Sequence, residues 1–448
     1  QVSKYNSSGT FLWTYNGIAV NSGFSEFAVL PSGSVIWGEG FNSGGARIYK
    51  ISPSGVLQIT GGPYSTEEVW TIFYNRCSNQ ILGFGGGPTS ANNLQIVNDT
   101  NLTGGTIKNY NGYVSNGNDV VDAIIDANGD FFAVQVSGMG PEKLQKCAGP
   151  AYNPPLLFDV SSGYGYQEGS WGGVGIFTNR ANVLALNSSY LYTYGGKTIK
   201  VWNKTSGALI SSMVVSGSYI DGVGRTCDGI AVDECNNVYV GGMGTIHAYQ
   251  FNGSSFIPLS NIATPGAVYD LAIDEANGVL YACGNGFMGT YSIPVSMSFS
   301  LSMVPAVCGN CNGSISIANT STCTSTGFRY IVNPGNITST VSPIVNLCPQ
   351  LYTVEVHLGC RGKIWSDTIT VNSTTYIPVN FSIANPLCNG GTGSATVQPY
   401  DANYNYTWQP SVSSGTLATN LMPGTYTVNV SSNIGSCTGS GTFQIIQP

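Results

Sequence analysis

The chain has 448 residues, enough for about three domains, and only 8% of them carry a charge. Ordinary soluble domains have roughly 25% charged residues, whereas the 42% of hydrophobic residues found here excludes intrinsic disorder. The net charge is −7 and no basic cluster is present, so we expect neither nucleic acid nor an anionic membrane surface as a partner. No stretch has the pattern of a membrane helix, and we expect no membrane insertion.

The first predicted element is a strand within Gln1 to Tyr15, with three aromatic residues on one face: Phe11, Trp13 and Tyr15. The segment from Lys4 to Trp13 resembles Lys50 to Gln58, which has the pattern of outer strands in the first repeat unit. We therefore expect the N-terminal strand to complete a sheet. That sheet is either the last one of its own repeat region or one in a neighbouring molecule.

Residues 1–294 repeat a short apolar strand, a polar turn and a second apolar strand. The pattern is clearest at Ile230 to Gly241 and at Leu271 to Ala282. The turns fall near residues 31, 75, 126, 187, 233 and 274, at spacings of 41 to 61 residues. Units of four short strands at such spacings are typical of β-propeller blades. We predict an all-β fold that begins with a propeller of six, or seven, blades.

Two further modules follow, at residues 295–377 (the first module) and 378–448 (the second module). Asn346 to Val356 recurs as Asn420 to Val430, 74 residues later. Strands that alternate Tyr-x-Val-x-Val in tandem units of this size indicate small Ig-like β-sandwiches. Pro294 and Pro378 mark the junctions, and short joints stiffened by proline favour a semi-rigid rod.

The second module resembles a known repeat. The segments Cys388 to Val397, Tyr406 to Trp408 and Leu421 to Val430 resemble the SprB-type repeat of large secreted adhesins from Bacteroidota. The resemblance covers about 70 residues well. It covers the first module with departures, because that module has three extra cysteines. Residues 1–294 resemble secreted propellers only generically. The resemblance implies secretion and surface display, with a role in adhesion or filaments, and it supplies no catalytic residue.

Twelve cysteines favour an oxidising compartment, and a chain that begins at Gln1 instead of Met fits removal of a secretion signal. Cys388 and Cys437 are the two cysteines of the second module, so we expect them to pair. Cys311 and Cys360 hold the equivalent places in the first module, although Cys308 is a rival for Cys311. A second bridge would then join two remaining cysteines of the first module, Cys323 and Cys348. The odd number left over permits one bridge from the propeller to the first module.

Thirteen Asn-x-Ser/Thr sequons are candidate glycosylation sites. They begin at Asn6, Asn98, Asn101, Asn187, Asn203, Asn252, Asn312, Asn319, Asn336, Asn372, Asn380, Asn405 and Asn429. Two interpretations are open. The sequons either carry glycans on a neutral surface or arise by chance in a chain rich in Asn, Ser and Thr.

Signals for catalysis or metal binding are weak. His247 and His357 lack neighbours at zinc-ligand spacing, so we expect structural or surface roles for both. Asp126 to Asp130 mimics the start of a calcium loop, but a turn between strands explains it better. Glu67 and Glu68 are adjacent and would face opposite sides of a strand. We expect no cofactor, no metal and no enzymatic activity.

Aromatic side chains offer one candidate binding loop. Tyr164, Tyr166 and Trp171 lie in a glycine-rich stretch outside the repeat pattern, where they either pack or stack on sugars.

Taken together, these features predict a secreted, extracellular structural protein. We expect the repeating subunit of a filament or surface layer, with copies of itself as partners. The alternative is a cell-surface adhesin that binds glycans or proteins through a propeller head on an Ig-like stalk.

Overall fold

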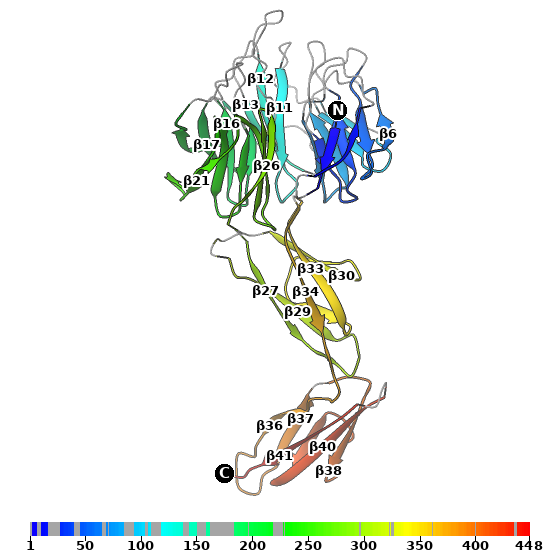
Figure 1. Ribbon diagram of the computed structural model, residues 1–448. Helices are drawn as coiled ribbons and strands as arrows, with labels where there is room; N and C mark the ends of the chain where they lie inside the picture. The colour runs from blue at the N-terminus through cyan, green and yellow to red at the C-terminus, as the bar shows by residue number, and fades with distance from the viewer. Residues whose placement is uncertain are drawn as a thin grey trace, which may run out of the picture. The chain divides into compact units, whose positions relative to one another are not determined.

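The computed structural model describes residues 2–6, 10–16, 27–39, 45–64, 69, 71–84, 94–103, 106–108, 118–137, 143–149, 158–161, 183–195, 197–217, 227, 229–294, 297–321, 323, 327–360, 362–398, 400–433 and 437–448. All regular structure in these ranges is β-strand, which confirms the all-β prediction. The chain divides into two compact units, shown in Figure 1. The larger unit contains Gln1–Ser298, Thr320–Arg329 and Glu355–Ser366, and the smaller unit contains Phe299–Asn319, Tyr330–Val354 and Asp367–Pro448. The division of the chain at residues 294 and 377 stays a prediction.

Six antiparallel sheets follow one another along the described part of the larger unit. Within each sheet the strands pair in chain order, except that the short strand Ile262–Ala263 pairs with the third strand of the fifth sheet. The first two contain β3 (Phe27–Val29), β4 (Val35–Gly38), β5 (Ile48–Ile51), β6 (Leu57–Gly61), β7 (Thr71–Asn75), β8 (Gln80–Phe84), β9 (Leu94–Asn98) and β10 (Thr106–Lys108). The next two contain β11 (Asn118–Ile125), β12 (Phe131–Ser137), β13 (Lys143–Cys147), β14 (Phe158–Ser161), β15 (Leu184–Leu186), β16 (Tyr190–Gly195), β17 (Thr198–Asn203) and β18 (Leu209–Val214). The last two contain β19 (Ile230–Val232), β20 (Asn237–Gly242), β21 (Thr245–Phe251), β22 (Phe256–Pro258), β23 (Ile262–Ala263), β24 (Val268–Asp274), β25 (Val279–Gly284) and β26 (Phe287–Ser292).

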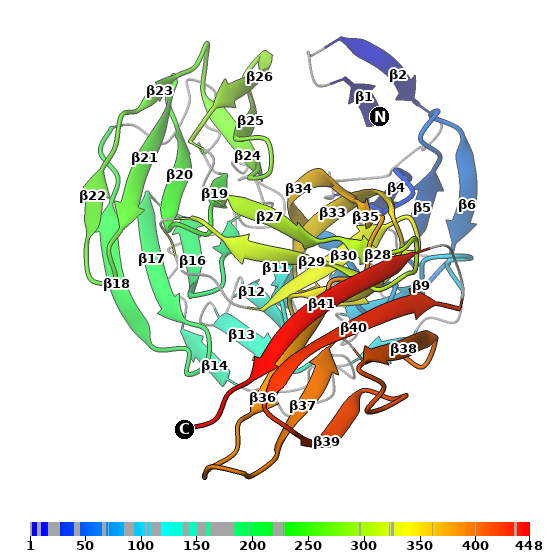
Figure 2. The same cartoon turned by 90° about the horizontal axis from the view of Figure 1, so that it is seen from below.

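The burial of each strand follows its place in its sheet. Every residue of β4 is buried, whereas the outer strand β18 alternates between half-buried and exposed positions. A central strand covered on both faces is expected to be a continuous apolar run, and an outer strand is expected to alternate. Figure 2 shows the sheets arranged around a common centre.

Buried apolar clusters join each sheet to the next. Ile36 and Ile48 of the first sheet pack with Ile72 and Ile81 of the second, and four comparable clusters connect the remaining consecutive sheets. At about 25 cal/mol per Å² of apolar surface, this burial is the main force that orders the sheets.

The N-terminal segment differs from the single strand that we predicted. Val2–Tyr5 (β1) and Phe11–Tyr15 (β2) pair with each other as an antiparallel hairpin, and they form a separate two-stranded sheet. Asn6 closes the hairpin, because its side-chain oxygen accepts the amide of Thr10 at 2.8 Å. The indole N–H of Trp13 donates to the carbonyl of Pro53 at 2.8 Å, which places the hairpin on the turn between β5 and β6. Among the described residues, therefore, this segment completes no sheet of the six.

The sheets after residue 298 are also antiparallel. One sheet contains β27 (Phe299–Val304), β29 (Gly313–Asn319) and β32 (Ile344–Leu347), and another contains β30 (Phe328–Asn333), β31 (Ile337–Ser339), β33 (Gln350–Leu358) and β34 (Gly362–Val371). A short parallel pair joins β28 (Ala306–Val307) to β35 (Ser373–Thr374). The last two sheets contain β36 (Asn380–Ala384), β37 (Gly393–Gln398), β39 (Leu417–Leu421), and then β38 (Tyr404–Gln409), β40 (Gly424–Ser432), β41 (Thr438–Ile445).

Alternating side chains build the core of the second module. Tyr404, Tyr406 and Trp408 of β38 are buried, and the residues between them are exposed. They share one cluster with residues from both sheets, among them Val428 and Ala395, so the two sheets pack face to face. The period-2 pattern seen in the sequence is therefore the alternation between core and solvent.

The two modules share a strand register. Gly313 pairs with Leu347 in the first module, and Gly393 pairs with Leu421 in the second. In both, the register shifts immediately after the glycine. This match fixes which residues of the two modules correspond.

Candidate functional site

Repeated turns form the most regular polar feature of the larger unit. The turn between the first two strands of each of five sheets is held by an Asn or Asp side chain: Asn75, Asp126, Asn187, Asp233 and Asp274. Each side-chain oxygen accepts backbone amides of its own turn, as Asn and Asp commonly do. The Asp126 carboxylate accepts the amides of Asn128 and Asp130 at 2.9 and 3.1 Å. These bonds support the turn interpretation of the segment that mimics a calcium loop.

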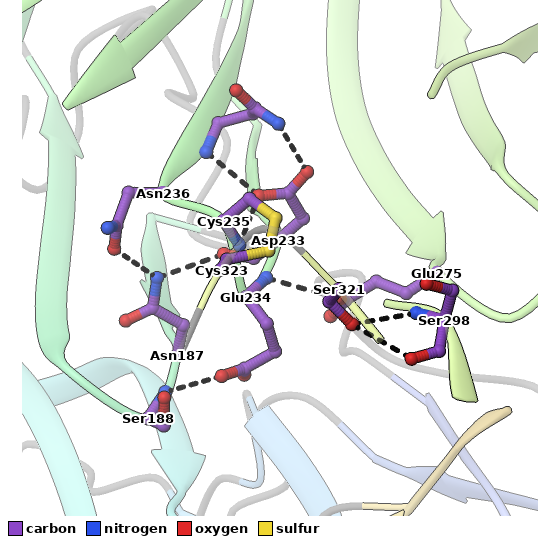
Figure 3. Close-up of a disulfide and its surroundings, with 11 residues drawn as sticks. Asn187, Ser188, Asp233, Glu234, Cys235, Asn236, Glu275, Ser298, Ser321 and Cys323 are labelled. Carbon is purple, nitrogen blue, oxygen red and sulfur yellow. Dashed lines mark hydrogen bonds between the residues drawn. A yellow bond between two sulfur atoms is a disulfide. The ribbon is translucent and has the colours of Figure 1, made fainter. Parts of the chain in front are cut away.

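Neighbouring turns are also bonded to one another, as Figure 3 shows. The amide of Ser188 donates to the carboxylate of Glu234 at 3.0 Å, and the amide of Glu234 donates to the carboxylate of Glu275 at 3.0 Å. The side-chain amide of Asn187 donates to the carbonyl of Asp233 at 2.9 Å. Glu234 is 2% exposed, so these bonds are shielded from water and satisfy groups that would otherwise be costly to bury.

Two of the repeated turns carry disulfides. Cys77 lies two residues after Asn75 and bonds to Cys360, and Cys235 lies two residues after Asp233 and bonds to Cys323. Both partners belong to segments that the larger unit takes from beyond residue 319. Figure 3 shows the second of these bonds. Two turns that are three sheets apart in chain order therefore hold the following part of the chain covalently.

Backbone contacts support the same joint. The amide of Cys360 donates to the carbonyl of Ala127 at 3.1 Å, on the turn of the third sheet. Gly359 adopts a φ of +48°, and a Cβ at this position would overlap the carbonyl oxygen of Ala127. Glycine is required here because the two backbones approach so closely.

His357 lies next to this joint. Its Nε2 is 2.9 Å from the carboxylate of Glu355, and the ring is buried. Burial lowers the pKa of His357, and the nearby charges of Arg329 and Arg76 lower it further against the opposing effect of Glu355. The imidazole is therefore held mainly neutral at neutral pH, as a structural residue.

The other two disulfides are in the smaller unit. Cys308 bonds to Cys437, and Cys311 bonds to Cys348. The first bond joins the first module to the second. Cys388 is exposed and forms no disulfide.

Each predicted pairing is therefore wrong. We expected Cys388 with Cys437, Cys311 with Cys360 and Cys323 with Cys348, on the assumption that each module closes within itself. Three of the four bonds instead link one module or repeat region to the next. The structure contains two bridges from the repeat region to the first module, where the sequence permitted one.

One sequon is misassigned. Asn187 is 0% exposed and its side chain is bonded within the turn and to the neighbouring turn, so the folded chain has no room for a glycan on it. The other twelve sequon asparagines are exposed, including Asn203 and Asn252 on turns. The structure leaves these twelve as candidates. The aromatic loop with Tyr164, Tyr166 and Trp171 and the pair Glu67 and Glu68 lie outside the described residues.

An apolar groove separates the sixth sheet from the first. It has a volume of about 430 Å³ and is lined by the hairpin, by Phe27 and Val29 of β3, and by Tyr281 and Met288 of the sixth sheet. Phe27 is 61% exposed and Met288 is 53% exposed. Each earlier pair of consecutive sheets shares a buried cluster, whereas this pair shares a groove in the described part of the chain.

A free thiol lies on the same sheet face as Met288, one of the residues that line the groove. Cys283 is directly opposite Met288 in the register of β25 and β26, so both side chains lie on the same face of the sheet. Cys283 is exposed and forms no disulfide. Burial of the sulfur among its neighbours raises the pKa of Cys283 to about 11, with a smaller contribution from the carboxylate of Asp270. The thiol is therefore protonated at neutral pH.

Comparisons with known proteins add fold information. No known protein family matches the sequence. No curated protein matches it either. The structure is similar to XC5397 from Xanthomonas campestris, a gluconolactonase, with 13% identity and a TM-score of 0.40, over 60% of this chain and 86% of that chain. It is also similar to the Dos1 propeller, with 11% identity and a TM-score of 0.44, over 65% of this chain and 71% of that chain. These neighbours are β-propeller proteins, in agreement with a generic propeller.

The comparison corrects one expectation. We expected that the chain is not an enzyme, and the similarity to a gluconolactonase contradicts that exclusion. At 13% identity the similarity is weak evidence for an activity and assigns no residue a role. The exclusion rested on motifs that are local in sequence, whereas a propeller brings together side chains from strands far apart in the chain. Such a constellation leaves no local motif.

The four disulfides indicate an oxidising environment. In the described ranges, no helix is long and apolar enough to span a membrane.

Proposed function

We propose that this protein is a secreted structural subunit of an extracellular filament or surface layer. The observation that carries the proposal is the set of covalent joints. Cys77–Cys360 and Cys235–Cys323 fix the repeat region to the chain that follows, and Cys308–Cys437 fixes the first module to the second. A chain that only needs to fold could place its disulfides inside each module. Disulfides across the joints instead hold neighbouring modules together under bending or tension, which a subunit of a filament or surface layer has to withstand.

Several finer features belong to this proposal. We take the six sheets as six propeller blades and the last two modules as Ig-like sandwiches related to the SprB-type repeat of Bacteroidota. The exposed sequon asparagines would carry glycans where the source performs N-glycosylation. The low charge fits a surface that neighbouring copies or glycans cover.

Electron microscopy of the purified, full-length chain tests the proposal. At micromolar concentration and near-neutral pH, we expect unbranched polymers with one axial repeat, and light scattering should show mass growth with concentration. The Trp13→Ala variant tests the hairpin, because it removes the bond to Pro53. We expect this variant to polymerise less while its four disulfides stay intact. A wild-type chain that stays monomeric at every concentration and salt tested would overturn the proposal.

The second candidate function is an adhesin that binds glycans or proteins. The apolar groove beside Phe27 and Met288 favours it, because a concave apolar surface is a usual place for a ligand. A glycan array and a surface-protein pull-down with the monomeric chain would show specific binding in this case. Substitution of Phe27 by Ser should then abolish the binding.

A further inference from the structure

The loop between β36 and β37 exposes an apolar side chain next to a free thiol. Leu387 is 98% exposed, and Cys388 is exposed without a disulfide. Ile446, which is 60% exposed, lies beside this loop, because its amide donates to the side chain of Asn385 at 3.0 Å. We call Leu387, Cys388 and Ile446 the end patch. A leucine so fully exposed costs free energy in water, which points to a partner that covers it.

The first module shows what this position does when it has a partner. Cys308 lies five residues before Gly313, as Cys388 lies five residues before Gly393, and the two glycines match in strand register. Val307 and Cys308 both pack against the core of the second module. Cys308 is also bonded to Cys437 of that module. The repeat therefore uses this apolar residue and this thiol to attach the domain that follows.

The disulfides also have a direction along the chain. The thiol in the turn before the last long strand of each module, β34 or β41, bonds backwards, since Cys360 joins Cys77 and Cys437 joins Cys308. The thiol before the glycine bonds forwards, as Cys308 does. Cys388 holds the forward position of the second module, and its thiol is exposed and forms no disulfide in the described chain.

The partner must offer a second thiol. All twelve cysteines lie in the described residues, eight of them are in disulfides, and Cys147 and Cys227 are buried. The remaining exposed thiol besides Cys388 is Cys283, which is paired with the groove residue Met288 and lies on the same face of the sheet. The end patch offers an apolar side chain with a thiol, and the groove offers an apolar surface beside a thiol.

We propose that Cys388 of one copy forms an intermolecular disulfide with Cys283 of a second copy, with Leu387 seated in the groove between Phe27 and Met288. The inference rests on the proposed function and names its partner as a second copy of this chain. The end patch of one copy meets the groove of another, so the contact is heterologous. Such a contact can repeat from copy to copy without forming a closed ring. The two thiols lose two protons and two electrons. A low-molecular-weight disulfide accepts them and is reduced to two thiols.

The test uses three full-length proteins: wild type, Cys283→Ser and Cys388→Ser. Each is incubated with oxidised glutathione at pH 8.5 and examined on non-reducing gels and by disulfide mapping. Wild type should give a ladder of dimers, trimers and longer species that collapses on reduction, with a peptide that links Cys283 to Cys388. Each variant alone should stay monomeric. An equimolar mixture of the two variants should give dimers and nothing longer, because each molecule keeps one competent end.

A second variant separates docking from thiol reactivity. Leu387→Asp should slow cross-linking by about tenfold or more, since it removes the apolar contact and buries a charge. The alkylation rate of Cys388 by iodoacetamide, measured in parallel, corrects for the effect of the new carboxylate on the thiol itself. Unchanged cross-linking in this variant would overturn the role of the groove.

Three results would overturn the disulfide itself. They are a wild type without cross-links, dimers of Cys283→Ser alone that reveal a bond between two Cys388 residues, and mapped bonds to any other cysteine. Electron microscopy of the Cys388→Ser variant distinguishes the absence of this disulfide from the absence of filaments, which would contradict the proposed function. Filaments that form without the thiol would leave the structural role standing and remove only this bond.

Discussion

Cys77 and Cys235 occupy the same place in two copies of one turn, each two residues after the side chain that caps it. Their sheets are three apart in chain order. The two bonds therefore hold the following segment at two separate points of the larger unit. A single bond would allow rotation about itself, whereas two bonds at separate points prevent it.

The first prediction concerns these two bonds. Replacing both cysteines of either pair by Ser should lower the unfolding temperature of the larger unit. In the chain-entropy view, each bond contributes roughly 5 kcal/mol when it acts alone. Either bond alone keeps the joint closed, so removal of one bond should lower the free energy of unfolding by clearly less than this value. Removal of both bonds should lower the free energy of unfolding by more than twice as much as removal of one. Calorimetry and limited proteolysis of the four proteins would measure this, and strictly additive losses would contradict it.

The second prediction concerns Gly359. Gly359→Ala should destabilise the joint by about 3 kcal/mol or more, because the new Cβ displaces the backbone of Ala127 in addition to straining a positive φ. Gly390→Ala is the matched control, since Gly390 has a φ of +81° with open space around it. The control should lose only about 1–2 kcal/mol. Calorimetry gives both values, and equal losses would show that the close approach to Ala127 has no energetic effect.

The third prediction concerns the bonds between neighbouring turns. Glu234→Ala removes the acceptor for the amide of Ser188 and should cost about 1–3 kcal/mol. Glu234→Gln keeps an oxygen acceptor of the same length and should cost less than half as much. Hydrogen exchange of the Ser188 amide is the direct readout, because the exchange should be fastest in the alanine variant. The same exchange rate in all three proteins would exclude the bond.

The fourth prediction concerns pH. The folded pKa of His357 lies below its ordinary value near 6.5, so the unfolded chain takes up the proton first as the pH falls. The larger unit should therefore lose stability below about pH 6.5, until the pH passes the lowered pKa. His357→Gln should flatten the dependence of the unfolding temperature on pH between 7.5 and 5.5. An identical slope in the variant would place the acid sensitivity elsewhere, and His247, whose pKa burial also lowers, would be examined next.

The strands and turns of this chain were predictable because their signals are local. Alternation in Tyr404 to Trp408 identifies a half-buried strand, and Asp233 followed by Asn236 and Asn237 identifies the turn that the structure shows. The N-terminal hairpin was also within reach, since Asn6 to Gly9 carries a turn signal between two short strands. The likeness of this segment to Lys50–Gln58 instead favours a single strand that pairs with another sheet.

The cysteine pairing was not predictable, because it depends on which surfaces meet. Spacing aligned Cys311 with Cys388, whereas the strand register aligns Cys308 with Cys388. The sequon at Asn187 failed for a related reason. Its triplet has the ordinary pattern, and only the fold places that asparagine under a neighbouring turn. A local motif reports a residue's chemistry, while its accessibility depends on the packing of distant parts.

The nesting of the two joint disulfides has a consequence for biosynthesis. Cys77 precedes its partner by 283 residues, and the Cys235–Cys323 bond lies wholly inside that span. At 5–20 residues per second, roughly 15–60 s pass between the synthesis of Cys77 and that of Cys360. During this interval the thiol of Cys77 meets every cysteine made before its partner. We therefore expect correct pairing in an oxidising compartment to require a disulfide isomerase, which reverses early mistakes that the folding of each sheet does not prevent.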